Sequence, residues 1–160
     1  MRVVVTGGAG FIGSHIADAL VARGDEVVVL DDLSNGVRAN VPAAATFVRG
    51  DVRDADAIDA AFRAFASGER PDAVCHLAGQ ASTFRSFDAP SWDMDVNGVG
   101  TARVLEGVRR HDVGTIVYAS SMTAYGHPER LPVTEDQRCA PVSFYGVTKW
   151  AAERAVLLMA

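Results

Sequence analysis

The sequence has 160 residues, of which 49% are hydrophobic, and a formal net charge of −5 from 15 basic and 20 acidic side chains. This balance is typical of one globular domain with a substantial core, and the lack of a Lys/Arg cluster argues against nucleic-acid binding. No stretch has the length of a membrane span, and the four scattered histidines argue against a metal site. Two separate cysteines, Cys75 and Cys139, with no targeting segment at the start of the chain predict a reducing, cytoplasmic location.

Short β-branched runs alternate with amphipathic stretches along the whole chain. In chain order we expect a strand at 2–6, a helix at 11–23, strands at 26–30 and 46–51, a helix at 54–66, a strand at 73–79, a helix at 90–111, a strand at 114–121 and a helix from 143 to the end. Asp54 and Ser143 are the expected N-caps of two of these helices.

Strands that are apolar throughout and alternate with helices predict a parallel sheet with helices on both faces. Right-handed crossovers then favour a Rossmann-type doubly wound α/β fold with strand order 3-2-1-4-5. We expect residues 1–160 to form one such domain. The sequence ends in "AVLLMA" with no sixth strand, so we expect the N-terminal part of a larger protein or a naturally short relative, with no C-terminal substrate domain.

Three glycines spaced three residues apart, Gly7, Gly10 and Gly13, stand where the first strand gives way to the first helix. A tight turn there needs the positive φ that glycine tolerates, and a close helix–strand contact needs a residue without Cβ. A pyrophosphate approaching the helix N-terminus also needs bare backbone and meets free N–H groups there. The spacing therefore predicts a dinucleotide site, although similar turns also occur without a ligand.

Asp31 ends the second strand, 18 positions after Gly13 in the sequence. A carboxylate at this place accepts hydrogen bonds from an adenosine ribose and repels a 2′-phosphate, which favours NAD over NADP. The alternative is a turn-forming aspartate beside Asp32, Ser34 and Asn35. Arg38 follows closely, and because arginine accommodates a 2′-phosphate, it could weaken the preference for NAD.

Six motifs stand in order along the chain: "TGGAGFIGSH", "GDVRD", "HLAGQAS", "VNGVGT", "YASSMTAYG" and "YGVTK". With them the chain resembles the extended short-chain dehydrogenase/reductase family, and within it the NAD-dependent epimerase/dehydratase group, over essentially all 160 residues. The resemblance implies NAD contacts at Gly7, Gly10, Phe11, Ile12, Gly13, Asp31, Asn35, Asp51, Val52, Leu77, Ala78, Gly79, Asn97, Tyr145 and Lys149. Without the resemblance, Asp51 would be interpreted as a strand-end turn residue and Asn97 as an ordinary polar helix residue.

Tyr145 and Lys149 are four residues apart, so they lie on one face of the last helix. An ammonium one turn away favours the phenolate, which would let the tyrosine act as a base nearer neutral pH. The bare pattern is common on helices, and its position after the fifth strand, behind Ser121, is what makes it informative. The resemblance implies that Ser121, Tyr145 and Lys149 are the catalytic residues and that Ser121, Thr123 and Tyr145 contact the substrate.

The resemblance implies epimerisation of a nucleotide sugar, most simply a UDP-sugar, by transient oxidation at the sugar 4-position. Met122, Thr123 and Ala124 follow Ser121, where family members that eliminate water carry acidic residues. Because elimination needs a further acid and base, this sequence favours an epimerase or simple oxidoreductase over a dehydratase. Two alternatives stay open: an NAD-binding module without turnover, and another oxidoreductase of the same fold that acts on a different carbonyl or alcohol.

Two further features concern substrate and partner. Arg85 could meet a phosphate or carboxylate of the substrate, although an exposed arginine without a ligand is the more frequent case. The family commonly forms homodimers through two helices, which here correspond to residues 90–111 and 144–160. Trp150, Val156 and Leu157 could form that surface or could belong to the core.

Overall fold

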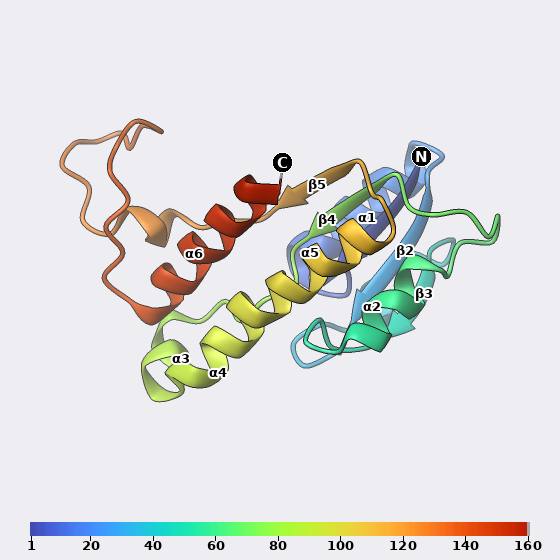
Figure 1. Cartoon of the computed structure of the whole chain (residues 1–160), viewed down its shortest axis with the longest axis horizontal. Helices are drawn as coiled ribbons and strands as arrows, with labels where there is room; N and C mark the ends of the chain where they lie inside the picture. The colour runs from blue at the N-terminus through green and yellow to red at the C-terminus, as the bar shows by residue number, and fades with distance from the viewer. Residues whose placement is uncertain (160) are drawn as a thin grey trace.

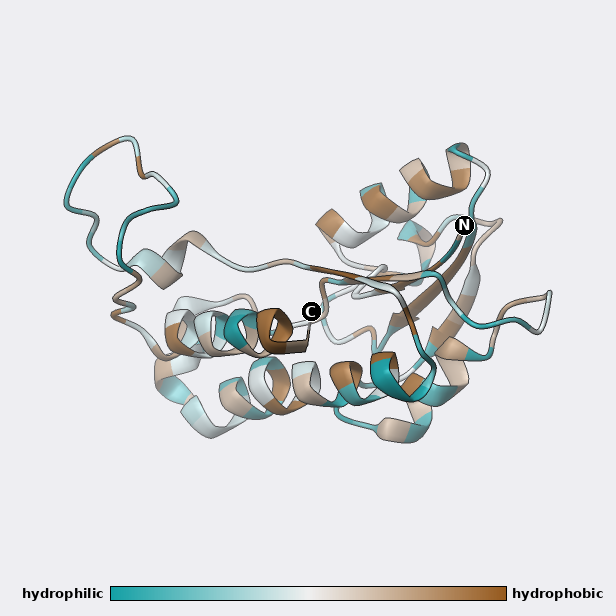
Figure 2. Ribbon diagram, turned by 45° about the horizontal axis from the view of Figure 1, so that its top comes forward, coloured by the Kyte–Doolittle hydropathy of each residue, from teal (hydrophilic) through white to brown (hydrophobic). Residues whose placement is uncertain are grey.

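Five short strands form one parallel sheet in the order β3-β2-β1-β4-β5, as predicted. In this computed structural model, which describes residues 1–159, the strands are β1 (Arg2–Thr6), β2 (Glu26–Asp31), β3 (Thr46–Arg49), β4 (Ala73–His76) and β5 (Thr115–Tyr118). Val4 at the centre of β1 is in register with Val28 of β2 and with Val74 of β4. The sheet is the most hydrophobic part of the ribbon (Figure 2).

Helices cover both faces of this sheet, as the alternating pattern predicted. They are α1 (Phe11–Ala22), α2 (Ala55–Phe62), α3 (Thr83–Asp88), α4 (Pro90–Met94), α5 (Gly100–Arg110) and α6 (Phe144–Met159). Figure 2 shows α1 on one side and α4, α5 and α6 on the other. No helix among residues 1–159 is long and apolar enough to span a membrane.

The side chains of each strand alternate between two separate cores. Val4, Val28 and Val74 point to the side on which Phe62 of α2 and Val104 of α5 are buried. The neighbouring residues of the same strands, among them Val3, Val5, Val27 and Val29, point to the opposite side and meet Ala17 of α1. This double burial explains why the strands are apolar at every position rather than at every second one.

The helix expected at 90–111 is continuous but changes its hydrogen-bond pattern in the middle. Residues 95–99 form a π-helical segment, η2 (Asp95–Val99), between α4 and α5, and the three segments run on without a break (Figure 1). Thr101 donates its hydroxyl hydrogen to the Asn97 carbonyl oxygen at 2.6 Å within this region. Such a bulge is frequent at functional sites and is not encoded by hydrophobic periodicity.

Two other helix predictions need correction. The helix predicted at 54–66 ends at Phe62, although Phe65 remains buried in the same core. Helix α3 was not predicted; its N-cap is Ser82, whose hydroxyl accepts the Arg85 N–H, and it ends before Pro90, because a residue that precedes proline avoids the helical conformation.

Both predicted helix caps are confirmed. The Asp54 carboxylate accepts the Asp56 N–H at 2.9 Å, and the Ser143 hydroxyl accepts the Gly146 N–H at 3.0 Å at the start of α6. Two short 3-10 helices, η1 (Arg38–Asn40) and η3 (Met122–Tyr125), lie in loops. The loop from η3 to α6 extends away from the sheet (Figure 1).

Candidate cofactor and active site

The segment from the end of β1 into the first turn of α1, here called the glycine loop (residues 7–13), uses Gly7, Gly10 and Gly13 for different purposes. Gly7 has φ +72°, and a Cβ there would lie 2.7 Å from the Ala78 nitrogen. A Cβ on Gly13 would collide with the Gly7 carbonyl oxygen. The turn and the close packing of α1 therefore both exclude side chains at these two positions.

Gly10 is different, because the protein itself hardly requires a glycine there. Its φ and ψ of −79° and 176° suit any residue, and a Cβ would meet nothing closer than the Gly7 oxygen at 3.3 Å. It is the N-cap of α1, and no side chain caps this helix. The N–H groups of the first turn are left without helical partners. The bare position therefore suits a phosphate group brought from outside the chain.

Asp31 clamps the glycine loop to the end of β2. Its side chain is buried, and its two oxygens accept the Ala9 N–H at 2.9 Å and the Leu33 N–H at 2.8 Å. Leu33 has φ +62°, so Asp31 does shape a tight turn. It also lines a cleft at the carboxyl ends of the strands, so its turn-forming role leaves the predicted contact with a cofactor open.

A cleft of about 690 Å³ runs along the carboxyl ends of the strands, where doubly wound sheets hold their ligands. Fourteen of the predicted site residues line it: Gly7, Gly10, Phe11, Ile12, Gly13, Asp31, Asn35, Asp51, Val52, Leu77, Ala78, Gly79, Tyr145 and Lys149. Asn97, Ser121 and Thr123 do not line it. Prediction from sequence missed several lining residues, including Arg53, Gln80, Trp92 and Ser120, whereas Arg85, considered there as a possible substrate contact, does line the cleft.

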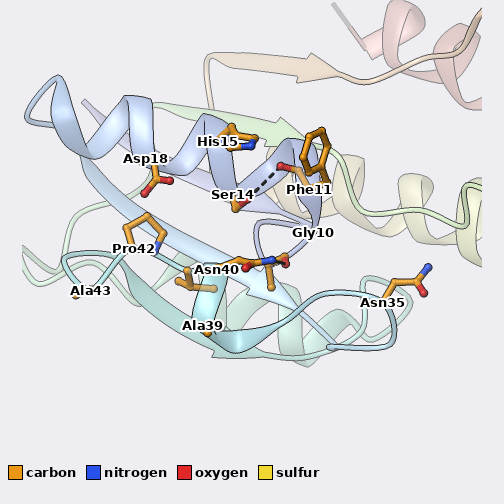
Figure 3. A pocket seen from close by; sticks show the side chains of 12 residues that line it. Gly10, Phe11, Ser14, His15, Asp18, Asn35, Ala39, Asn40, Pro42 and Ala43 are labelled. Carbon is orange, nitrogen blue, oxygen red and sulfur yellow. Dashed lines mark hydrogen bonds between the residues drawn. The ribbon is translucent and has the colours of Figure 1, made fainter.

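A second cavity of about 660 Å³ lies between α1 and the segment after β2 (Figure 3). It shares Gly10, Phe11 and Asn35 with the main cleft. His15 and Asp18 of α1 lie on one side of it and the Asn40–Ala43 segment on the other (Figure 3). This cavity adjoins the glycine loop on the side away from α6.

Tyr145 and Lys149 enter the cleft from the first turns of α6. Lys149 is only 5% exposed, and burial lowers the pKa of its ammonium to about 8, an effect that the negative charge of Asp93 opposes. Burial disfavours the charged form because the ammonium loses water. Lys149 can therefore exchange its proton closer to neutral pH than an exposed lysine.

A buried group of side chains, here called the polar layer (Gln80, Asp93, Asn97 and Thr148), joins three segments behind the cleft. The Asp93 carboxylate, fully buried in α4, accepts hydrogen bonds from the Gln80 amide at 2.5 Å and from the Thr148 hydroxyl at 2.6 Å. The Asn97 side chain accepts the Gln80 N–H at 2.9 Å and donates to its carbonyl oxygen at 3.1 Å. Asn97 thus holds the loop after β4 and, through Thr148, the turn of α6 beside Lys149.

His76 at the end of β4 belongs to a directional chain of hydrogen bonds. The Thr101 hydroxyl donates to the Asn97 carbonyl oxygen, so it must accept from His76 Nε2 at 3.0 Å. His76 Nδ1 then accepts from the Thr6 hydroxyl at 2.6 Å, and Thr6 in turn accepts the Ala78 N–H at 3.2 Å. Burial lowers the pKa of His76 to about 3, which agrees with a neutral ring of fixed tautomer.

Ser121 lies at the start of η3, after β5. Its hydroxyl oxygen accepts the Thr123 N–H at 3.3 Å and lies 2.9 Å from the Thr123 hydroxyl. The adjacent Ser120 lines the cleft instead, and its hydroxyl donates to the Glu153 carboxylate. Ser121 is thus the N-cap of η3, Thr123 lies within η3, and neither residue is among those that line the cleft.

Three cations line the cleft in different electrostatic settings. Arg53 pairs with Asp51, and this pairing lowers the pKa of the Asp51 carboxyl. Lys149 is buried, as described above. The Arg85 guanidinium lies 5.1 Å from the centre of the Trp92 ring and makes no ion pair within residues 1–159. In the same residues no group of three or more His, Cys, Asp or Glu side chains is arranged to hold a metal ion.

Comparison with known proteins agrees with this geometry. Residues 3–160 match the model of the NAD dependent epimerase/dehydratase family. The chain belongs to this family. Among its curated relatives, the UDP-glucose 4-epimerase of Mycolicibacterium smegmatis is 42% identical over 154 residues, which cover 96% of this chain and 49% of the relative. The UDP-glucose 4-epimerase of Streptomyces lividans is 41% identical over 155 residues, or 97% of this chain and 46% of the relative.

Solved structures of family members match the whole described fold. The UDP-glucose 4-epimerase of Thermus thermophilus in complex with NAD has a TM-score of 0.91 at 43% identity, covering 99% of this chain and 50% of that one. The Thermotoga maritima UDP-glucose 4-epimerase with UDP-glucose has a TM-score of 0.93 at 34% identity, covering 100% and 51%. This chain spans about half the length of the relatives it matches.

Proposed function

We propose that this chain is the NAD-binding part of a nucleotide-sugar 4-epimerase and carries its catalytic Tyr145 and Lys149. The observation that supports this proposal is a single cleft lined by the glycine loop and by both of these side chains. Relatives named as UDP-glucose 4-epimerases, one of them solved with NAD and one with UDP-glucose, favour a UDP-sugar as substrate.

Two features of the cleft support a dinucleotide as its ligand. Gly10 leaves space beside the free N–H groups of α1, and Asp31 lines the cleft with a carboxylate that still has acceptor capacity for a ribose hydroxyl. Arg38 stacks on Phe47 at 4.7 Å and does not line the cleft. Arg53, which does line the cleft, is paired with Asp51. Because the Asp31 carboxylate disfavours a 2′-phosphate and neither arginine is free to receive one, we expect NAD rather than NADP.

Lys149 would stabilise the phenolate form of Tyr145, and this phenolate would take the proton of the sugar 4-hydroxyl and become a neutral phenol. Lys149 would also hold the nicotinamide ribose. NAD⁺, when bound, supplies the hydride acceptor for oxidation at the same carbon and the donor for its reversal. Tyr145 would return the proton after the 4-keto sugar has turned over to present its other face. Ser121 would hydrogen-bond the substrate oxygen, which requires its hydroxyl to leave Thr123.

The residues that follow Ser121 support epimerisation over elimination of water. Met122, Thr123 and Ala124 form η3 and supply no carboxylate. A dehydratase needs an acid and a base in addition to the tyrosine. Arg85 would contribute charge toward an anionic part of the substrate, since it lines the cleft without an ion-pair partner in the described residues.

The alternative is a chain that binds NAD without turnover, because it spans about half the length of its relatives. Isothermal titration of the chain with NAD and NADP tests the first step, with Gly10→Ala as the variant expected to weaken binding. An assay that interconverts UDP-glucose and UDP-galactose tests the second, with Tyr145→Phe as the inactive control. NAD binding without interconversion would favour the alternative, and failure to bind NAD would contradict the proposal itself.

We also propose a homodimer through the helices at 90–111 and 144–160. Several apolar side chains on these helices are exposed: Met94 and Val99 are each 44% exposed, Val147 is 40% and Leu157 is 55%. Val156, by contrast, is buried and belongs to the interior. Light scattering of the chain and of a Val147→Glu, Leu157→Glu variant tests this proposal.

We also propose a cytoplasmic location, because the Cys75 and Cys139 thiols are both free, as is usual in a reducing compartment.

A further inference from the structure

Lys149 is the only lysine in the 160-residue sequence. Its ammonium nitrogen lies 4.3 Å from the centre of the Tyr118 ring, which belongs to β5. At this distance a cation is attracted to the face of an aromatic ring, and the attraction grows when the cation is shielded from water. Lys149 is almost completely buried, so we expect its attraction to the Tyr118 ring to be stronger than that of an exposed lysine.

The other groups around Lys149 do not hold its nitrogen directly. Asp93 of α4 exerts a charge effect on it, but the Asp93 carboxylate is bound to Gln80 and Thr148 instead. His76 of β4 is neutral, and Glu153 of α6 accepts a hydrogen bond from Ser120. Tyr145 precedes Lys149 by one turn on α6. Within residues 1–159 no hydrogen bond or ion pair of the Lys149 nitrogen is formed, and the face of the Tyr118 ring is the specific contact that it makes.

The Tyr118 ring is held by packing rather than by its hydroxyl group. It lies 5.6 Å from the His76 ring, centre to centre, with an angle of 38° between the planes. Its hydroxyl is buried and has no hydrogen-bond partner among residues 1–159. A buried hydroxyl without a partner opposes folding, so the hydroxyl does not explain why an aromatic residue stands here. The feature of Tyr118 that an aliphatic residue would lack is the ring face that it presents to the Lys149 nitrogen.

We propose that Tyr118 is a positioning residue for Lys149: the face of its ring holds the ammonium at the cleft, in its charged form, through a cation–π contact. This role goes beyond the proposed epimerase function, which needs a charged Lys149 near Tyr145 but does not say what keeps it there. His76 keeps the ring in place from the side of β4, and the neutral state of His76 adds no competing positive charge.

The single lysine makes a direct test possible. Labelling the lysine Cε with ¹³C gives one side-chain resonance, which a Lys149→Arg variant confirms, and its pH titration reports the pKa of Lys149 without cofactor or substrate. For Tyr118→Phe, which keeps the ring, we expect the lysine pKa to stay near the wild-type value of about 8. For Tyr118→Leu, which keeps the apolar bulk but removes the ring face, we expect it to fall by about one unit, a tenfold loss of proton affinity.

Other outcomes contradict the proposal. An unchanged pKa in Tyr118→Leu would show that the ring face does not stabilise the charge, and a rise toward 10.5 would show that the ring only excludes water. Equal shifts in the Phe and Leu variants would assign the effect to the hydroxyl. Val117→Ala, on the same strand at a 58% exposed position, is the control for a general disturbance of β5 and should leave the titration unchanged.

If Tyr118→Leu fails to fold, which circular dichroism would detect, Tyr118→Met replaces it with a similar apolar volume. Tyr118→Phe should also raise the free energy of unfolding slightly, because it removes the unpaired hydroxyl. The titration needs neither NAD nor turnover. The epimerase proposal would fail through missing NAD binding or missing interconversion of UDP-sugars, whereas the proposed role of Tyr118 would fail through the lysine titration. The two failures are therefore distinguishable.

Discussion

The two sides of the cleft are built in contrasting ways. The glycine-loop side consists of one continuous stretch of chain, clamped by Asp31, and its geometry follows from backbone constraints at Gly7 and Gly13. The α6 side depends on the polar layer and on Tyr118, which come from the loop after β4, from the α4–η2 region, from β5 and from α6. Local chemistry is therefore enough to form a phosphate cradle, whereas the lysine site needs several elements to be assembled first.

The largest expected effect is a loss of catalytic rate, and it comes from a substitution on the α6 side. It tests whether this side of the cleft supplies the catalytic base. Tyr145→Phe removes the proton acceptor but leaves the ring, so we expect UDP-sugar interconversion to fall by about 10²–10⁴-fold while NAD affinity changes little. The measurements are steady-state kinetics and calorimetric titration with NAD. Tyr125→Phe is the matched control, because Tyr125 does not line the cleft. Equal activity in the two variants would exclude Tyr145 as the base.

The glycine loop can be tested by separating its structural and ligand-facing positions. Gly13→Ala should lower the free energy of unfolding by about 1–3 kcal/mol, since its Cβ meets the Gly7 backbone and the loop must shift. Gly10→Ala should leave stability nearly unchanged but weaken NAD binding by at least about tenfold, or ~1.4 kcal/mol. Chemical denaturation and calorimetry measure the two quantities. If Gly10→Ala binds NAD as tightly as wild type, the phosphate is not seated at this residue.

The polar layer should depend on the charge at its centre. Asp93→Asn replaces one acceptor oxygen by a donor that faces other donors, so we expect a loss of about 1–3 kcal/mol of stability. The exposed Asp95→Asn, two residues away, should cost much less. Loss of the negative charge at Asp93 should also move the pKa of Lys149 further below its value of about 8. A stable Asp93→Asn protein with an unchanged lysine titration would show that the layer does not support the α6 side.

The smallest expected effect is a change in the free energy of unfolding with each unit of pH, and it comes from His76. Its pKa is about 3 in the folded protein and near 6.5 in the unfolded chain, so between these values the unfolded state binds more protons. Stability should therefore be complete above pH 6.5 and fall by about 1.4 kcal/mol per unit as the pH decreases toward 3. Denaturation curves at about pH 7 and pH 5 measure this slope. His76→Gln should lose that part of the slope, and an identical slope in both proteins would mean that His76 is protonated when folded.

Sequence reasoning succeeded where a feature is local. The strand order and the parallel sheet follow from the alternation of β-branched runs with amphipathic stretches, and both N-caps follow from single residues that act on their own neighbours in the chain. The fourteen predicted contacts that line the cleft came from the family resemblance, and their contact with a cofactor stays a prediction. The π-helical segment at Asp95–Val99 and helix α3 were not predicted, since neither alters the hydrophobic periodicity in a recognisable way. Asn97 was named as a cofactor contact, and in the structure it instead supports the loop at Gln80.

The sequence by itself determined the glycine loop, the doubly wound sheet and the placing of Tyr145 one turn before Lys149. Only the tertiary structure decided that Asp93 is fully buried, that His76 is neutral with a fixed tautomer, and that the Tyr118 ring lies against the one lysine. The physical reason is that backbone preferences depend on neighbouring residues, whereas burial, hydrogen-bond direction and pKa depend on which distant side chains the fold brings within a few ångströms.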